Sequence, residues 1–166
     1  MAGNHLEDLV AEWYEFKGYF VRRNVQVGKR PKGGYECELD VVAFHPAERR
    51  LVQVEPSLDA HTWAEREARY SKKFAAGRKY IPALFAGLDL PNEIEQVALL
   101  VFASISGRQT LAGGRILLIG DFMRQVRAGL AERSVARAGI SEQFPLLRTL
   151  LFAAQYWNVE KQTPNL

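Results

Sequence analysis

The sequence predicts an α/β fold, with a mixed β-sheet flanked by helices. Three strand-like runs follow one amphipathic helix, a near-continuous apolar run of strand length lies further along, and helical patterns separate and follow these strands. No repeat, low-complexity tract or Pro/Ser-rich linker interrupts the 166 residues. We therefore expect one domain over residues 1–166, with a core over about 3–119 and extra C-terminal helices over about 121–158.

The first half of the chain is typical of a helix followed by a three-stranded meander. Asn4 and Glu7 have the spacing of a capping box, and apolar residues then recur at helical intervals until Gly18. Runs of β-branched and aromatic residues, separated by the turns GKRPKGG and HPAERR, follow this helix. We expect strands over residues 19–27, 35–44 and 51–56.

The second half predicts helices before and after two further strands. A helical pattern runs from about Asp59 to Gly77, where glycine favours a helix end. The run QVALLVFAS is suited to a central strand that is buried on both faces. The order α-β-β-β-α-β-β-α-α is completed by strands over 96–104 and 115–120 and helices over about 121–133 and 142–157. The final helix is apolar nearly all round, so we expect it to be largely buried.

Composition and charge limit the setting and the partners. The net charge of +3 and the pI near 9.1 permit a nucleic-acid partner only through local basic clusters. The single cysteine, Cys37, cannot form an internal disulfide, and no Cys/His spacing predicts a zinc site, so a reducing, cytoplasmic setting fits best. No run approaches the roughly 18 apolar residues that span a bilayer, so we expect no membrane insertion.

Carboxylates recur on two neighbouring predicted strands. Side chains two apart share a strand face, which groups Glu36, Glu38 and Asp40 on one face of the second strand. The opposite face is then expected to hold the apolar residues Cys37, Leu39, Val41 and Ala43. In the third strand Gln53 and Glu55 share a face. A short turn joins the two strands, so they are expected to be antiparallel neighbours with Asp40 and Glu55 close together.

Two adjacent carboxylates repel each other unless a cation lies between them. Mg²⁺ suits such a site because it accepts a few carboxylate and carbonyl oxygens, keeps several waters, and completes its shell with substrate phosphate oxygens. Mn²⁺ accepts the same oxygen donors. Asp40 and Glu55 therefore suggest metal-assisted phosphodiester chemistry.

These residues resemble the PD-(D/E)XK nuclease superfamily, within it the Holliday-junction-resolvase and restriction-like branches. The resemblance covers roughly residues 3–105. Glu7 matches the glutamate of the leading helix, and in ECELDVVAF Asp40 matches the metal-binding aspartate. In LVQVEPS, Gln53 takes the first place of the (Glu/Gln)-x-Lys motif. The resemblance implies a restriction-endonuclease-like αβββαβ core, DNA as partner and a divalent metal as cofactor.

The sequence departs from the family pattern in two places. Leu39 precedes Asp40 where the motif has proline, and Glu55 stands where the motif has lysine. In this family, a glutamate there is expected to bind metal or to act as a base for the attacking water. A lysine from the following helix offers the missing positive charge. Lys73 is the better substitute because Lys72 lies nearly opposite the apolar face of that helix.

The resemblance also suggests secondary roles. The carbonyl of Val54 would add a metal ligand, and Gln53 and Glu7 would place waters, although Glu7 also has a capping role with Asn4. A basic cluster on and around the first hairpin could contact DNA phosphates or could be a soluble turn. This cluster consists of Arg22, Arg23, Lys29, Arg30 and Lys32.

Two functions follow from these residues. The first is a metal-dependent DNA endonuclease whose catalytic residues are Asp40, Glu55, Gln53 and Lys73. The second is a nuclease-fold module that has lost catalysis and binds DNA or a partner protein, because lysine is missing from the third strand. The apolar final helix would also suit an interface, so a homodimer is among the expected assemblies.

Overall fold

The protein is described here by a computed structural model that covers residues 4–131, 133–136 and 139–157. The ends of the predicted domain, residues 1–3 and 158–166, lie outside these ranges, as does residue 132 of the predicted 121–133 helix. The described residues form an α/β structure with a six-stranded mixed sheet. Its strands are β1 (Phe20–Lys29), β2 (Tyr35–His45), β3 (Arg50–Ser57), β4 (Glu95–Leu100), β5 (Thr110–Leu111) and β6 (Gly114–Leu118).

The sheet has the spatial order β1-β2-β3-β4-β6-β5. β1, β2 and β3 form the expected antiparallel meander, whereas β4 lies parallel to β3, and β6 lies parallel to β4. A parallel neighbour requires a crossover connection, and the helix between β3 and β4 supplies it. The two-residue strand β5, antiparallel to β6, was not predicted, because a pair of residues carries no alternating pattern.

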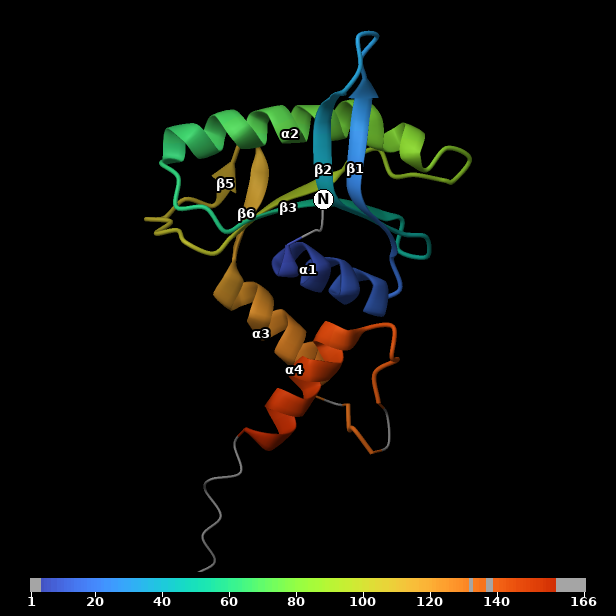
Figure 1. Ribbon diagram of the computed structural model, residues 1–166, viewed down its shortest axis with the longest axis vertical. Coiled ribbons are helices and arrows are strands. Elements are labelled where there is room, and N and C mark those ends of the chain that lie inside the picture. Colours follow the sequence, from blue (N-terminus) through green and yellow to red (C-terminus); the bar gives the residue numbers. More distant parts are fainter. Residues whose placement is uncertain (1–3, 132, 137–138, 158–166) are drawn as a thin grey trace, which may run out of the picture.

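Helices cover both faces of the sheet (Figure 1). α2 (Trp63–Leu84) crosses one face, and α1 (His5–Phe16), α3 (Ile119–Leu130) and α4 (Pro145–Tyr156) lie on the other. The largest apolar cluster packs α1, α3 and α4 against the sheet, and two smaller clusters pack α2 against the opposite face. No helix among the described residues is long and apolar enough to cross a bilayer.

A buried glutamate joins the first helix to the last. Glu12 is 4% exposed, and its carboxylate accepts hydrogen bonds from the backbone N–H groups of Leu146 and Leu147 at 3.0 Å each. These groups belong to the first turn of α4, whose N–H donors have no partner inside the helix. Glu12 therefore caps α4 from outside, which explains why a carboxylate is buried there.

The boundaries of α2 differ from the prediction at both ends. The helix begins at Trp63 because Thr62 and Glu65 form a capping box, and it continues past Gly77 to Leu84. Gly77 is a packing glycine: a Cβ there would lie 1.9 Å from Oε1 of Gln53. Its lack of a side chain lets β3 approach the helix, so it does not mark a helix end.

The apolar face predicted for β2 is split between the two layers. Cys37 and Leu39 pack with the α2 side, whereas Val41 and Ala43 belong to the cluster around α1. Asn24 of the neighbouring strand has a φ of 50° and lies between the residues paired with Leu39 and Val41. A residue in this left-handed region interrupts the regular alternation of side chains, so the single apolar face was a wrong prediction.

The final helix is less buried than its composition suggested. Only Leu147 and Leu151 of α4 are buried, and the aromatic residues at its C-terminal end are largely exposed. Phe152, Tyr156 and Trp157 are 44%, 61% and 84% exposed. One face of α4 contacts α1 and α3, whereas the aromatic side chains at its C-terminal end remain largely exposed.

Candidate active site

Asp40 and Glu55 lie where two strands of the sheet separate. The pairing of β2 with β3 ends at Val41 and Val54. Beyond this pair, β2 continues beside β1, and β3 continues beside β4. The next residues on each side are Asp40 and Glu55, which the antiparallel register places opposite each other. The structure therefore brings together the two carboxylates that the alternation pattern predicted.

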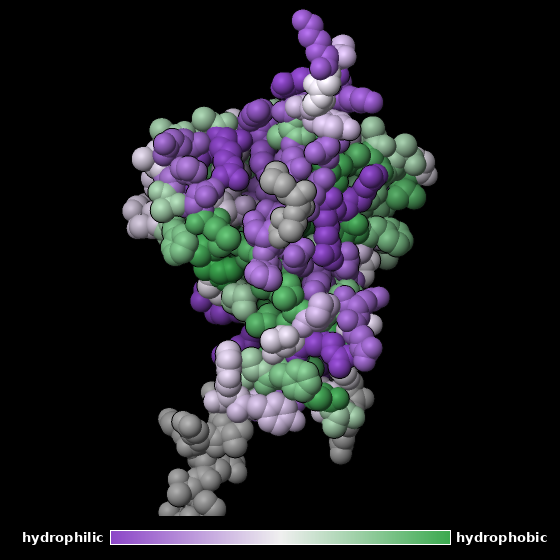
Figure 2. Space-filling model, viewed as in Figure 1, coloured by the Kyte–Doolittle hydropathy of each residue, from purple (hydrophilic) through white to green (hydrophobic). Residues whose placement is uncertain are grey.

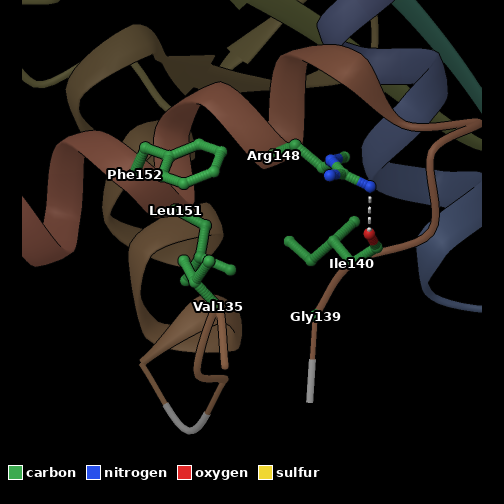
Figure 3. Close-up of a pocket in the computed structure, with 6 residues that line it drawn as sticks. All are labelled: Val135, Gly139, Ile140, Arg148, Leu151 and Phe152. Atoms are coloured by element: carbon green, nitrogen blue, oxygen red, sulfur yellow. Dashed lines mark hydrogen bonds between the residues drawn. The ribbon is translucent and has the colours of Figure 1, made fainter. Parts of the chain in front are cut away.

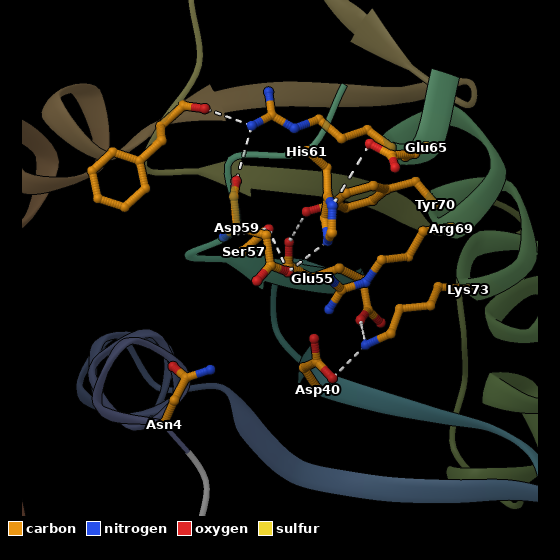
Figure 4. Close-up of polar contacts among 12 residues, drawn as sticks. Asn4, Asp40, Glu55, Ser57, Asp59, His61, Glu65, Arg69, Tyr70 and Lys73 are labelled. Atoms are coloured by element: carbon orange, nitrogen blue, oxygen red, sulfur yellow. Dashed lines mark hydrogen bonds and ion pairs between the residues drawn. The ribbon is translucent and has the colours of Figure 1, made fainter. Parts of the chain in front are cut away.

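Lys73 extends from α2 and contacts both carboxylates (Figure 4). Its Nζ lies 2.5 Å from Oδ1 of Asp40 and 2.5 Å from Oε2 of Glu55. Asp40 is 6% exposed and Glu55 is 1% exposed, so these charges interact largely shielded from water. Lys73, and not the exposed Lys72, thus lies at the place where the family motif has its lysine, and its catalytic role stays a prediction.

The surroundings of Asp40 and Glu55 disfavour ionisation of both carboxyl groups at once. Burial, and then the charge of Asp40, raise the pKa of Glu55 to about 8 despite the opposing effect of Lys73. Burial alone would lower the pKa of Lys73, but the charges of Glu55 and Asp40 outweigh it and the pKa is raised. Burial and the nearby charge of Asp40 also raise the pKa of Glu7. One ammonium group thus compensates the carboxylates incompletely.

This imbalance predicts a pH dependence of stability in the absence of divalent metal. Between about pH 4.5 and pH 8, Glu55 keeps its proton in the folded protein and has released it in the unfolded chain. The free energy of unfolding is therefore expected to fall as pH rises through this window, by up to about 1.4 kcal/mol per pH unit. The raised pKa of Lys73 lies above the window. Urea unfolding in EDTA at several pH values measures this dependence. In Glu55→Gln, whose side chain does not titrate, the free energy of unfolding should fall less with pH. Equal pH slopes in the variant and the wild type would contradict the prediction.

A chain of polar side chains connects Glu55 with the outer surface of α2. Nε2 of Gln53 donates to Oε1 of Glu55 at 2.8 Å and to the carbonyl of Lys73 at 3.2 Å. Nε2 of Gln96 donates to Oε1 of Gln53 at 2.7 Å, and Nη1 of Arg78 donates to Oε1 of Gln96 at 2.6 Å. Arg78 can only donate, so it fixes the orientation of both amides and directs a donor at Glu55. Gln53 therefore positions Glu55, and its predicted role in placing a water stays a prediction.

The close contact of Gln53 with α2 gives a stability prediction. Gly77→Ala is expected to lower the free energy of unfolding by about 1–3 kcal/mol, because the new methyl group collides with the Gln53 amide. The matched control is Gly120→Ala in α3, where the nearest atom is the flexible Nη1 of Arg124 at 3.7 Å. The control should be neutral or stabilising by up to about 1 kcal/mol. Urea denaturation measures both, and equal effects would exclude the packing role of Gly77.

Three other residues from the sequence prediction lie around this cluster in different roles: Glu7, Val54 and Glu36. Glu7 is half-buried and forms the capping box with Asn4, so its ordinary role is confirmed. Burial, and then the charge of Asp40, raise its pKa. The side chain of Val54 packs into the cluster around α1, which leaves its carbonyl as the group predicted to bind metal. Glu36 does not join Asp40, because it binds Tyr80 at 2.7 Å.

The predicted basic cluster is dispersed. Arg23 forms ion pairs with Asp8 at 3.5 Å and Glu15 at 3.1 Å, and Arg22 donates to the carbonyl of Leu84 at 3.3 Å. These arginines thus have partners on α1 and α2. Three of the cluster's residues follow towards the hairpin tip, where the surface is hydrophilic (Figure 2): Lys29, Arg30 and Lys32. DNA contact by all five residues stays a prediction.

Several residues around the site were missed from the sequence. Tyr70 is buried and donates its hydroxyl to the carbonyl of Glu55 at 3.0 Å. Asp59 lies beyond the end of β3 and pairs with Arg69, which precedes Lys73 by one turn of α2 (Figure 4). Tyr70 and Arg69 share the helix that carries Lys73, so helical spacing was the one available signal.

A separate cavity of about 160 Å³ lies between α4 and the segment that precedes it (Figure 3). It is lined mainly by apolar side chains, and Arg148 donates to the carbonyl of Ile140 at its edge. Leu151 and Phe152 form part of the wall. Its described lining residues include no carboxylate, histidine or cysteine, so they supply no group for acid–base or metal chemistry.

The donors at the strand separation suit a hard divalent cation. Asp40 and Glu55 supply carboxylate oxygens, which Mg²⁺ and Mn²⁺ prefer to sulfur and imidazole ligands. Among the described residues, no group of three or more His, Cys, Asp or Glu side chains is assembled as a metal centre. The two carboxylates would therefore need further oxygen ligands from backbone, water or substrate, as is usual for Mg²⁺.

Comparisons with known proteins were made for the whole chain. The chain matches no protein-family model, and a search of curated proteins finds no match. The geometry and charge of the site are therefore the basis for its function.

Proposed function

We propose that this protein is a metal-dependent endonuclease of the PD-(D/E)XK type that hydrolyses DNA phosphodiester bonds. Three features support the proposal: the α-β-β-β-α-β order of its first elements, the separation of β2 and β3, and the carboxylates placed there. Its restriction-endonuclease-like core would span α1 to β4, with β5, β6, α3 and α4 added to it.

The observation that carries the proposal is a buried excess of carboxyl groups over cationic side chains. Glu12, another buried glutamate, is explained by the helix that it caps. Among the described residues, Lys73 is the one cationic side chain in ion-pair contact with Asp40 or Glu55. A buried arrangement of two carboxylates and one ammonium is costly for stability alone. It is suited to holding a cation that carries more than one charge.

Each residue then has a defined task. Asp40 and Glu55 would hold the cation, and the carbonyl of Val54 would add an oxygen. A bound Mg²⁺ or Mn²⁺ would supply an activated water and positive charge to neutralise charge that develops on the phosphate. Lys73 leaves its place between the carboxylates and directs its ammonium at a phosphate oxygen or at the attacking water. Gln53 holds Glu55 in position through the amide chain described above.

The proposal is tested by incubating the purified protein with supercoiled plasmid, single-stranded DNA and a four-way junction. Cleavage of at least one substrate is expected with Mg²⁺ or Mn²⁺, and none with EDTA. Products should carry the 5′ or 3′ phosphate expected of hydrolysis. Absence of cleavage on all three substrates with both metals would count against the proposed activity.

A second candidate function has one specific observation in its favour. Lys73 bridges Asp40 and Glu55 at the place where a metal would lie, and this ion pair can serve as a structural element. The protein would then be an inactive nuclease-fold module that binds DNA or a partner protein. This alternative predicts no stabilisation by divalent metal at this site, whereas the first predicts stabilisation that depends on Asp40.

A further inference from the structure

A basic groove lies between the β1–β2 hairpin and α2, beside the candidate site. Its volume is about 350 Å³, and its lining includes Arg30 at the hairpin, Cys37 of β2, and Lys72 and Lys79 of α2. Lys72 and Lys79 are separated by two turns of helix, so they line the same side of α2. The groove thus has cationic side chains on both walls.

The charge in the groove is predominantly positive. Three cationic side chains face one carboxylate, that of Glu36, which pairs with Lys79 at 3.3 Å. A hydrogen bond from Tyr80, together with one from Lys79, lowers the pKa of Glu36, so it stays charged. Lys72 is exposed and makes no ion pair or hydrogen bond with another described residue. The ammonium of Lys72 is therefore available to an anionic ligand.

The groove and the candidate site are built from neighbouring residues of the same two elements, β2 and α2. Lys72 precedes Lys73, and Cys37 lies three residues before Asp40 on β2. Three residues of a strand span roughly 10 Å, so a nucleic-acid strand bound at Cys37 could also reach Asp40. Seven helical residues from Lys72 to Lys79 span about 10 Å, and one DNA strand advances about 3.4 Å per phosphate. The two lysines thus match a stretch of about three nucleotides.

We propose that this groove binds the phosphate backbone of the DNA strand that enters the candidate site, with Arg30, Lys72 and Lys79 as phosphate contacts. The inference rests on the proposed function for its partner. The proposal adds Lys72 and Lys79 to the predicted DNA-binding residues. The carboxylate of Glu36 in the same groove is expected to weaken DNA binding. Cations spaced about 10 Å apart along α2 favour a linear polyanion over a compact anion.

Fluorescence polarisation with a labelled 30-base-pair duplex tests the groove in EDTA, where a metal-dependent nuclease cannot cut. Lys72→Gln combined with Lys79→Gln is expected to weaken binding at least about tenfold. The slope of log K against log salt should become shallower by about 0.9 for each lost phosphate contact. Glu36→Gln is expected to strengthen binding, because it removes the negative charge and releases Lys79.

Arg127→Gln is the matched control, because Arg127 is an exposed cation on α3, which lies across the sheet from α2. It should change binding less than twofold. Three results would overturn the assignment of the groove as a DNA-binding site. They are binding by the double variant within twofold of the wild type, an equal loss of binding in the control, and no binding of DNA by the wild type. Equal competition by polyglutamate and DNA would also overturn it, since any polyanion would then suffice.

The two proposals fail in different ways. If the double variant binds and cleaves DNA like the wild type, the groove assignment is wrong and the nuclease function stands. If the double variant loses binding but the wild type never cleaves with Mg²⁺ or Mn²⁺, the groove stands and the nuclease function is wrong.

Discussion

Asp40→Asn is expected to reduce the rate of Mg²⁺-dependent DNA cleavage at least about 10³-fold. Asparagine keeps the shape of aspartate but removes the charge that helps to hold the cation. Metal catalysis supplies several kcal/mol of charge stabilisation, and each 1.36 kcal/mol corresponds to a factor of about ten in rate. Initial rates of plasmid nicking, measured with saturating Mg²⁺ and with Mn²⁺, give the comparison.

The control for this variant is Asp89→Asn. Asp89 forms an ion pair with Arg49 and its side chain is 81% exposed, so its charge contributes little to folding or to the site. It should cleave DNA at the wild-type rate. Cleavage by Asp40→Asn at more than about a tenth of the wild-type rate would indicate a contaminating nuclease or a site elsewhere.

Lys73→Met is expected to lower the free energy of unfolding by about 3 kcal/mol at pH 8. The substitution leaves Asp40 and Glu55 buried without their ammonium partner, and breaking a buried ion pair costs about 3–5 kcal/mol. Protonation of one carboxylate offsets part of this loss. The deficit should therefore shrink towards pH 5 and grow towards pH 9, as expected for Glu55, whose pKa is raised by folding.

Lys72→Met is the matched control for stability, because Lys72 precedes Lys73 on the same helix and is exposed. Its effect should stay within about 0.5 kcal/mol. Urea unfolding in EDTA measures both variants. Addition of Mn²⁺ should stabilise Lys73→Met more than the wild type, since the cation no longer competes with the ammonium. A Lys73→Met protein as stable as Lys72→Met would show that the bridge between the carboxylates does not form.

The central pair of the site could be predicted from local rules. Strand alternation placed Asp40 and Glu55 on matching faces, and the short turn between β2 and β3 made antiparallel pairing the simplest connection. Lys73 followed from helical spacing, which relates residues within one element. These inferences needed only neighbours along the chain or across one turn.

The supporting residues depended on contacts that span the fold. Gln96 meets Gln53 because β4 lies parallel to β3, and this register is set only after the crossover helix has packed. Gly77 resembled a helix end in sequence, and only its contact with Gln53 reveals its role. The break in alternation between Leu39 and Val41 likewise depends on the backbone of a neighbouring strand at Asn24.

The exposure of the C-terminal end of α4 could not be predicted from its amino-acid composition. An apolar helix is buried only as far as other elements extend to cover it. Here α1 and α3 cover the face that holds Leu147 and Leu151, and Trp157 lies beyond their reach.

The central claim is that Asp40 and Glu55 form a divalent-cation site, and thermal unfolding in Mn²⁺ tests it most directly. At a concentration tenfold above the dissociation constant, binding contributes about 1.4 kcal/mol, which raises the Tm of a chain this size by roughly 3–6 °C. We predict this rise in the wild type and in Asp89→Asn, and its loss in Asp40→Asn. A Tm that does not respond to Mn²⁺, or that rises equally in Asp40→Asn, would contradict the account.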